Sequence, residues 1–201
     1  MRDRDRTAGV SPASSSASRK AHAGWHSRGY PPHFDAADLV QHIVFRLADS
    51  LPGHVRQHLA QQPQSDRAQA TDAALDQAHG RRDLDHPAVA EMVENALLRF
   101  DGERYRLLGW CIMPNHVHVL IEAMEGHRLE TIVHSWKSFT AHAANRLLDR
   151  QTTFWAREYF DRYMRDEQQL AATLAYIEGN PVSAGLCAGP ADWPYSSARR
   201  G

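Results

Sequence analysis

The chain has 201 residues, enough for one domain with a hydrophobic core and some unstructured sequence besides. Its 23 basic and 24 acidic residues are balanced in both halves, so no global positive charge indicates a nucleic-acid partner, and a phosphate-binding surface would have to be local. Because no apolar run suits a signal peptide or membrane span, and Cys111 and Cys187 form no CxxC, we expect a soluble, cytoplasmic protein without a disulfide framework or thiolate zinc site.

Residues 1–28 are rich in Ser, Ala and Arg and contain few large aliphatic side chains. Such a segment cannot bury enough apolar surface to offset the entropy lost on ordering. We therefore predict a disordered leader at 1–28 and a single folded domain at 29–201. Basic leader residues, including Arg28, either contact a polyanion such as DNA or are simply solvated.

The first half of the predicted domain begins with a strand at 40–47, which is rich in β-branched and aromatic residues. A polar insertion at about 53–83 has weak helical periodicity and predicts one or two poorly packed helices. Asp85 then suits the N-cap of a helix that continues to about residue 100, with Pro87 in its first turn.

The second half contains an apolar strand at 105–112 and a turn at Pro114-Asn115, followed at once by a strand from His116. These two strands should form an antiparallel hairpin. The next helix, 128–149, has an apolar stripe at helical spacing. The residues of that stripe are Leu129, Ile132, Val133, Trp136, Phe139, Ala143 and Leu147.

An aromatic-rich strand near 159–164 precedes the last helix, which Asp166 and Gln169 should open as a capping box. Pro181 disfavours helical geometry at Asn180, so this helix should stop or bend there. The order strand, helix, strand, strand, helix, strand, helix predicts an α+β, ferredoxin-like fold. It would have a four-stranded antiparallel sheet, helices packed on one face and an additional C-terminal helix.

Two histidines lie at alternate positions of the predicted strand after Pro114. Side chains alternate across a strand, so His116 and His118 share one face, roughly 7 Å apart, while Val117 and Val119 face the other side. Neutral imidazole is a common metal ligand, and this pair could hold one ion. Alternatively, both are structural histidines satisfied by hydrogen bonds.

Tyr176 and Asn180 are four residues apart on the last helix and therefore share a face. A tyrosine oxygen can attack a phosphodiester and become covalently linked to it. The Asn180 oxygen could complete a site that suits Mg²⁺ or Mn²⁺. The alternative is an ordinary aromatic residue and a helix-end amide; Tyr159 and Tyr163 compete for the role of nucleophile.

Four motifs, in this order and spacing, resemble the REP-associated tyrosine transposases, relatives of the single-tyrosine HUH transposases of insertion sequences. The motifs are Met113-Pro114-Asn115-His116-Val117-His118-Val119-Leu120, Ser135-Trp136-Lys137-Ser138-Phe139, Tyr159-Phe160-Asp161-Arg162 and Tyr176-Ile177-Glu178-Gly179-Asn180-Pro181. The resemblance extends over roughly residues 30–198.

The resemblance implies a metal-dependent DNA strand transferase that binds single-stranded or hairpin DNA, often palindromic repeats. It would cleave and rejoin the strand through a 5′-phosphotyrosine intermediate. By position, Tyr176 matches the nucleophile, and the metal ligands are His116, His118 and Asn180. Lys137 is a candidate phosphate contact, or else a solvated helix lysine. Mg²⁺ or Mn²⁺ is the expected cofactor, and the protein is expected to be a monomer or homodimer.

Two other functions remain open at this point. One is a domesticated, non-catalytic protein that binds DNA hairpins and keeps the same fold and DNA surface. The other is a metal-binding α+β domain unconnected with DNA.

Overall fold

The computed structural model describes residues 24–26, 33–35, 39–77 and 79–200. Most of the predicted leader, including Arg28, lies outside the described residues. Its described part, β1 (Gly24–His26), pairs antiparallel with β2 (His33–Asp35) in a small two-stranded sheet. Within the described parts of the chain, no helix is both long and apolar enough to cross a membrane.

The main sheet has four strands in the order β4-β5-β3-β6, and all neighbouring pairs are antiparallel. The strands are β3 (Val40–Arg46), β4 (Tyr105–Ile112), β5 (His116–Ala123) and β6 (Phe160–Tyr163). Helices connect β3 to β4 and β5 to β6, whereas β4 and β5 form the predicted hairpin. This order and connectivity confirm the predicted ferredoxin-like fold.

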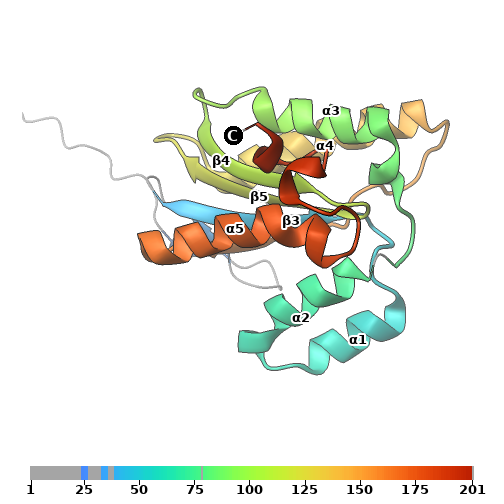
Figure 1. Ribbon diagram of the computed structural model, residues 1–201, viewed down its shortest axis with the longest axis horizontal. Helices are drawn as coiled ribbons and strands as arrows, with labels where there is room; N and C mark the ends of the chain where they lie inside the picture. The colour runs from blue at the N-terminus through green and yellow to red at the C-terminus, as the bar shows by residue number, and fades with distance from the viewer. Residues whose placement is uncertain (1–23, 27–32, 36–38, 78, 201) are drawn as a thin grey trace, which may run out of the picture.

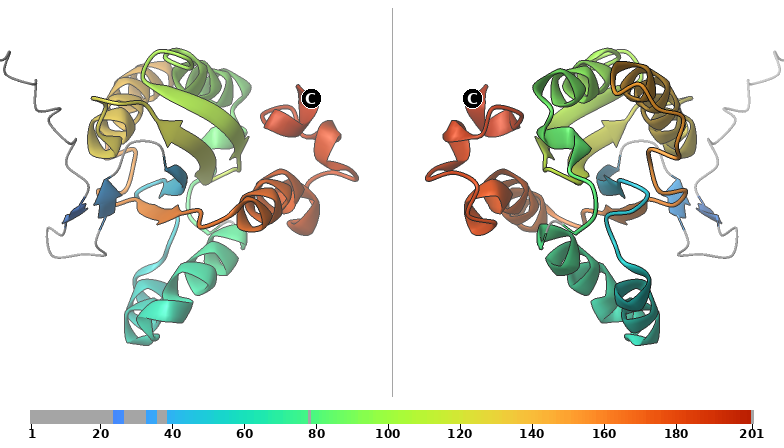
Figure 2. Two further views of the ribbon diagram at one scale, coloured as in Figure 1. Left: turned by 90° about the vertical axis from the view of Figure 1, so that its left-hand side faces the viewer. Right: turned by 90° about the vertical axis from the view of Figure 1, so that its right-hand side faces the viewer.

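Helices α3 (Pro87–Leu98) and α4 (Leu129–Leu147) cover one face of the sheet (Figures 1 and 2). Alternate hydrophobic residues of β3 and β5, such as Phe45 and Val119, are fully buried beneath them. The N-cap of α3 is His86 rather than the predicted Asp85, because residues 83–85 form a separate 3₁₀ turn.

The predicted apolar stripe of α4 is wrong in its C-terminal half. Phe139 and Leu147 are 60% and 46% exposed, while Thr140 is buried and continues the core-facing row after Trp136. The hydroxyl of Thr140 donates to the Trp136 carbonyl and accepts from the Trp155 indole N–H, at 2.7 and 2.9 Å. A polar side chain satisfied in this way can occupy the core, which hydrophobic periodicity alone does not reveal.

Helices α1 (Gly53–Gln61), α2 (Gln64–Asp76) and α5 (Glu167–Ser183) lie on the other side of the sheet (Figure 1). The prediction of poorly packed helices in the insertion is wrong for Leu59 and Leu75. Both are buried in a cluster with Val44 of β3. The insertion is therefore attached to the sheet.

Helix α5 begins as predicted but ends later. The Asp166 carboxylate accepts from the Gln169 backbone N–H at 2.7 Å, and the Gln169 side chain accepts from Arg165 N–H at 2.9 Å. The helix continues through Pro181 to Ser183. Its last turn is held by bonds from Ala184 N–H to the Asn180 carbonyl and from Leu186 N–H to the Pro181 carbonyl.

The attachment of α2 predicts a large effect of Leu75→Ala. Leu75 is 1% exposed, and truncating a buried leucine usually costs about 2–5 kcal/mol in the free energy of unfolding. Urea denaturation monitored by tryptophan fluorescence measures this loss. The control is Ala73→Ser, an exposed position on the same helix, which should change it by less than about 0.5 kcal/mol. A loss below 1 kcal/mol for Leu75→Ala would contradict the described packing.

Candidate active site

Strand β5 places the two motif histidines on the face of the sheet opposite α3 and α4. His116 and His118 are fully buried and pair across the sheet with Arg46 and Val44 of β3. Their Nε2 atoms stand 2.9 Å apart, with ring centroids at 4.8 Å. The alternation predicted from the sequence therefore brings two imidazole nitrogens to one point.

The hydrogen bonds of Asn115 fix which nitrogen of His116 carries the proton. The Asn115 side-chain NH₂ donates to the backbone carbonyls of Leu75 and His79, at 3.2 and 3.3 Å, so its other atom is the oxygen. That oxygen lies 2.7 Å from His116 Nδ1 and must accept a hydrogen bond from it. In the neutral ring, Nε2 of His116 then presents a lone pair toward His118.

A third histidine, which the sequence analysis missed, supports the pair. His42 on β3 is 6% exposed, its Nε2 lies 3.0 Å from His118 Nδ1, and the two rings stack at 5.2 Å. Such a partner on the outer nitrogen orients a ligating imidazole. Alternation along the predicted first strand puts His42 on the face opposite Ile43 and Phe45, so the sequence could have shown that it does not face the core. It could not show that this strand lies beside the strand of His118, because the order of strands in the sheet is not a local pattern.

Burial keeps the three imidazoles neutral. It lowers the pKa of His116 to about 3, and that of His42 to about 4 with a smaller contribution from the positive charge of Arg162. The pKa of His118 is lowered well below its ordinary value by burial and then by the other two histidines. Neutral rings keep their lone pairs available for a metal ion at physiological pH.

Helix α5 brings the other two predicted residues to the same place. Asn180 is 1% exposed, and its Nδ2 lies 3.0 Å from His118 Nε2. The Tyr176 ring meets the His118 ring edge-on at 5.7 Å, and the residue as a whole is 43% exposed. All of these side chains belong to one chain.

The competing tyrosines lie elsewhere. Tyr163 pairs with Gln41, whose side chain belongs to the row facing α3 and α4, and directly paired residues share a face. Tyr159 packs against the core cluster beneath the same helices. Neither tyrosine is on the histidine face of the sheet.

Two aspartates from α2 face the site, and the sequence analysis missed them. The Tyr176 hydroxyl donates to Asp72 Oδ2 at 3.4 Å, and Asp76 Oδ1 lies 3.7 Å from His116 Nε2. Burial, with repulsion from Asp76, raises the pKa of Asp72 to about 7, and burial raises that of Asp76 to about 6. Burial and both carboxylates raise the pKa of Tyr176 above its ordinary value.

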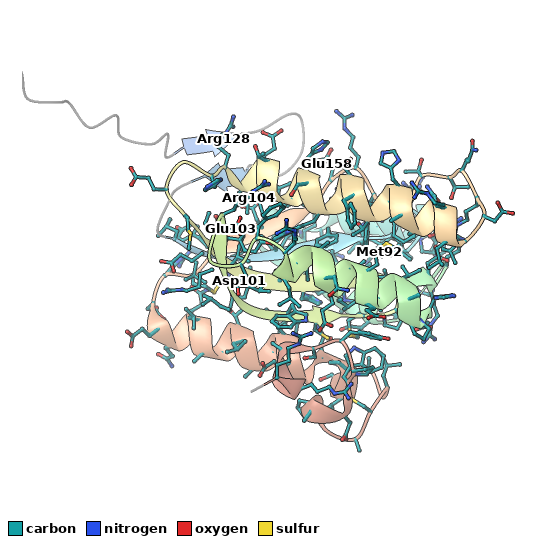
Figure 3. All side chains as sticks on the ribbon, turned by 90° about the horizontal axis from the view of Figure 1, so that it is seen from above. Met92, Asp101, Glu103, Arg104, Arg128 and Glu158 are labelled. Atoms are coloured by element: carbon teal, nitrogen blue, oxygen red, sulfur yellow. The ribbon has the colours of Figure 1, made fainter. Side chains whose placement is uncertain are left out.

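Lys137 is not part of this constellation. It lies on α4, in the layer seen from above in Figure 3, on the other side of the sheet from the histidines. Its Nζ donates to the Arg157 carbonyl at 2.7 Å, and burial lowers its pKa to about 8 against the opposing effect of Glu158. A DNA contact by Lys137 stays a prediction.

The buried polar atoms test whether a metal ion suits the site. In the described residues, no three His, Cys, Asp or Glu side chains by themselves form a group that could hold an ion. The amide of Asn180 has to be included, and its Oδ1 is buried without a hydrogen-bond partner. We call the His116 and His118 nitrogens and the Asn180 oxygen the histidine–amide site. Two imidazole nitrogens and an amide oxygen without another partner suit a divalent cation that takes mixed ligands.

Comparisons with known proteins identify transposases that this chain resembles. The family model "Transposase IS200 like" matches residues 81–180, a range that includes both β5 histidines, Tyr176 and Asn180. A Haemophilus influenzae protein named as a REP-associated tyrosine transposase is 33% identical over 100 residues, which are 45% of this chain and 57% of that protein. The Escherichia coli K12 REP-associated tyrosine transposase is 24% identical over 115 residues, 55% and 65% of the two chains.

A fold with this sheet order, carrying paired histidines and a helix-borne tyrosine, defines a single-tyrosine transposase-like domain. Over residues 81–180 the chain matches the IS200-like transposase family, as its motifs predicted. It spans about three fifths of the length of the curated relatives that it matches. A solved REP-associated tyrosine transposase bound to a REP hairpin shares the fold, with a TM-score of 0.60 and 16% identity over 87% of this chain and 84% of that one.

The raised pKa of Asp72 predicts a pH-dependent effect of Asp72→Asn on stability. Between about pH 4 and 7 the folded chain binds a proton here that the unfolded chain does not, so the penalty for burying the carboxylate grows as the pH rises. Urea denaturation should show the variant gaining stability relative to wild type from pH 5 to pH 8. Glu125→Gln, on the exposed turn after β5, controls for the loss of one negative charge. An Asp72→Asn difference that stays constant over this range would contradict burial of the carboxylate.

Proposed function

We propose that this protein is a DNA strand transferase of the transposase type. It binds single-stranded or hairpin DNA, such as palindromic repeats, and cleaves and rejoins the strand through a 5′-phosphotyrosine at Tyr176. The reaction uses Mg²⁺ or Mn²⁺ in the histidine–amide site. The family match supports the reaction class, and the names of the relatives and of the solved neighbour support REP hairpins as the kind of DNA.

One observation carries the proposal: a partly exposed tyrosine stands against the buried histidine pair within one chain. Tyr176 and Asn180, one turn apart on α5, both reach His118, at 5.7 Å between rings and 3.0 Å between Nδ2 and Nε2. A purely structural tyrosine would not need to stay partly exposed beside fully buried histidines. Because the site is complete in one chain, a monomer suffices for the reaction.

The side chains of the histidine–amide site would hold the divalent cation through two imidazole nitrogens and the Asn180 oxygen. When bound, the cation polarises the scissile phosphate and neutralises charge that develops on it. Asn115 and His42 hold the two imidazoles in register for this task.

In the cleavage step, the Tyr176 oxygen forms a bond to phosphorus while the bond from phosphorus to the 3′ oxygen breaks. The tyrosine proton passes to Asp72, the acceptor of its hydroxyl, and the departing 3′ oxygen takes up a proton from solvent water to become a free hydroxyl. Rejoining is the reverse, with the 3′ hydroxyl of a strand attacking the phosphotyrosine. No external energy source is needed, because the phosphotyrosine retains the energy of the broken bond.

This mechanism predicts a covalent protein–DNA adduct that Tyr176→Phe abolishes. Single-stranded DNA carrying a hairpin is incubated with the protein and Mn²⁺, and the adduct is seen as a slower band on a denaturing gel. The phenyl ring keeps the edge-on contact with His118 but has no oxygen to attack phosphorus, so adduct yield should fall by at least about 10³-fold.

Tyr163→Phe is the matched control, because this tyrosine points to the opposite face of the sheet and should leave adduct formation unchanged. An adduct that persists in Tyr176→Phe would refute the assignment of the nucleophile. Hairpin binding by the wild type without cleavage, unaffected by chelator, would instead support the domesticated, non-catalytic binding protein.

A further inference from the structure

We propose that Asp76, on the inserted helix α2, is a further oxygen ligand of the divalent cation in the histidine–amide site. The inference rests on the metal site of the proposed function and extends it to a segment outside the family match. Asp76 precedes residues 81–180, so its role is not implied by that match. The insertion would then be a structural part of the active site.

The positions of three candidate ligand atoms support this role. His116 Nε2 lies 2.9 Å from His118 Nε2 and 3.7 Å from Asp76 Oδ1. The Asn180 side chain adjoins the same place, with its Nδ2 3.0 Å from His118 Nε2. Around an octahedral ion with bonds of about 2.1 Å, neighbouring ligands stand about 3 Å apart and opposite ones about 4.2 Å. The Nε2–Nε2 and Nε2–Oδ1 separations fall in this range. Because the two histidines and Asp76 do not by themselves form a group that could hold an ion, the Asn180 oxygen is required beside them.

Hydrogen bonding does not explain the position of the carboxylate. Because His116 Nδ1 donates to Asn115, its Nε2 has no proton to offer, and a lone pair faces a carboxylate oxygen. Asp76 Oδ1 is itself buried without a hydrogen-bond partner, as is Asn180 Oδ1. Such acceptors repel one another unless a positive charge lies between them.

The backbone of α2 is fixed where it presents this side chain. Leu75, the preceding residue, is 1% exposed, and its carbonyl accepts from the Asn115 amide at 3.2 Å. The same amide orients His116, so one residue sets both the imidazole and the end of α2. A ligand needs support of this kind to hold its geometry.

A cavity also borders the site. A cavity of about 210 Å³ has Asp76, Asn115 and His116 among its lining residues. The carboxylate and the imidazole therefore border the same cavity. Because Mg²⁺ and Mn²⁺ prefer oxygen ligands, a carboxylate adds both the preferred atom and a negative charge to an otherwise neutral set.

The test measures Mn²⁺ binding to the full chain without DNA, by isothermal titration calorimetry and by loss of the free-ion electron paramagnetic resonance signal. Asp76→Asn should weaken binding by at least about tenfold, and Asp76→Glu, which keeps a carboxylate, should recover part of that loss. Asp72→Asn is the matched control. It removes the same charge from the same helix but faces Tyr176, so it should weaken binding by less than about threefold.

The outcomes separate this inference from the proposed function. If His118→Ala abolishes Mn²⁺ binding while Asp76→Asn binds as wild type does, Asp76 is not a ligand and the histidine–amide site stands. Equal losses in Asp72→Asn and Asp76→Asn would reduce the role of Asp76 to its charge and would also overturn the inference. A wild-type protein that binds no Mn²⁺ overturns both assignments. Circular dichroism verifies that each variant folds, and Asp76→Glu tests the ligand if Asp76→Asn does not.

Discussion

The side-chain amide of Asn115 makes the contacts on which the rest of the site depends. Its oxygen accepts a hydrogen bond from His116 Nδ1–H at 2.7 Å. Its NH₂ group donates to the carbonyl of Leu75, near the end of α2, and to that of His79, which follows α2. One buried group therefore selects the tautomer of an imidazole and attaches the inserted helix to the sheet. Because an amide has distinct donor and acceptor ends, neither an acid nor an apolar residue could do both.

Burial gives this arrangement its chemical character. Three imidazoles on one sheet face have their pKa values lowered by desolvation, so they remain neutral and present lone pairs instead of positive charge. On the same side, the burial of Asp72 and Asp76 raises their pKa values. Imidazole lone pairs and carboxylates that are poorly solvated favour the binding of a divalent cation. One of the carboxylates, Asp72, also lies beside Tyr176 as a proton acceptor.

Local patterns in the sequence were enough for the fold and for part of the site. Period-two alternation placed His116 and His118 on one face, helical spacing placed Tyr176 with Asn180, and Asp166 marked the start of α5. The buried Thr140 escaped detection because its hydroxyl is satisfied by the distant Trp155. The pairing of β3 with β5 brings His42 to the site, and the packing of α2 against the sheet brings Asp72 and Asp76 there. Neither contact follows from the spacing of residues within one helix or strand.

The central claim is that Tyr176 is the residue that becomes joined to DNA. Tryptic digestion of the protein–DNA adduct, after nuclease trimming, should yield a modified peptide spanning residues 166–199, which contains Tyr176 and Tyr195. Tandem mass spectrometry of this peptide then locates the nucleotide. The structure predicts a phosphonucleotide on Tyr176, whereas a modified Tyr195, or an adduct on any other peptide, would contradict the active site described above.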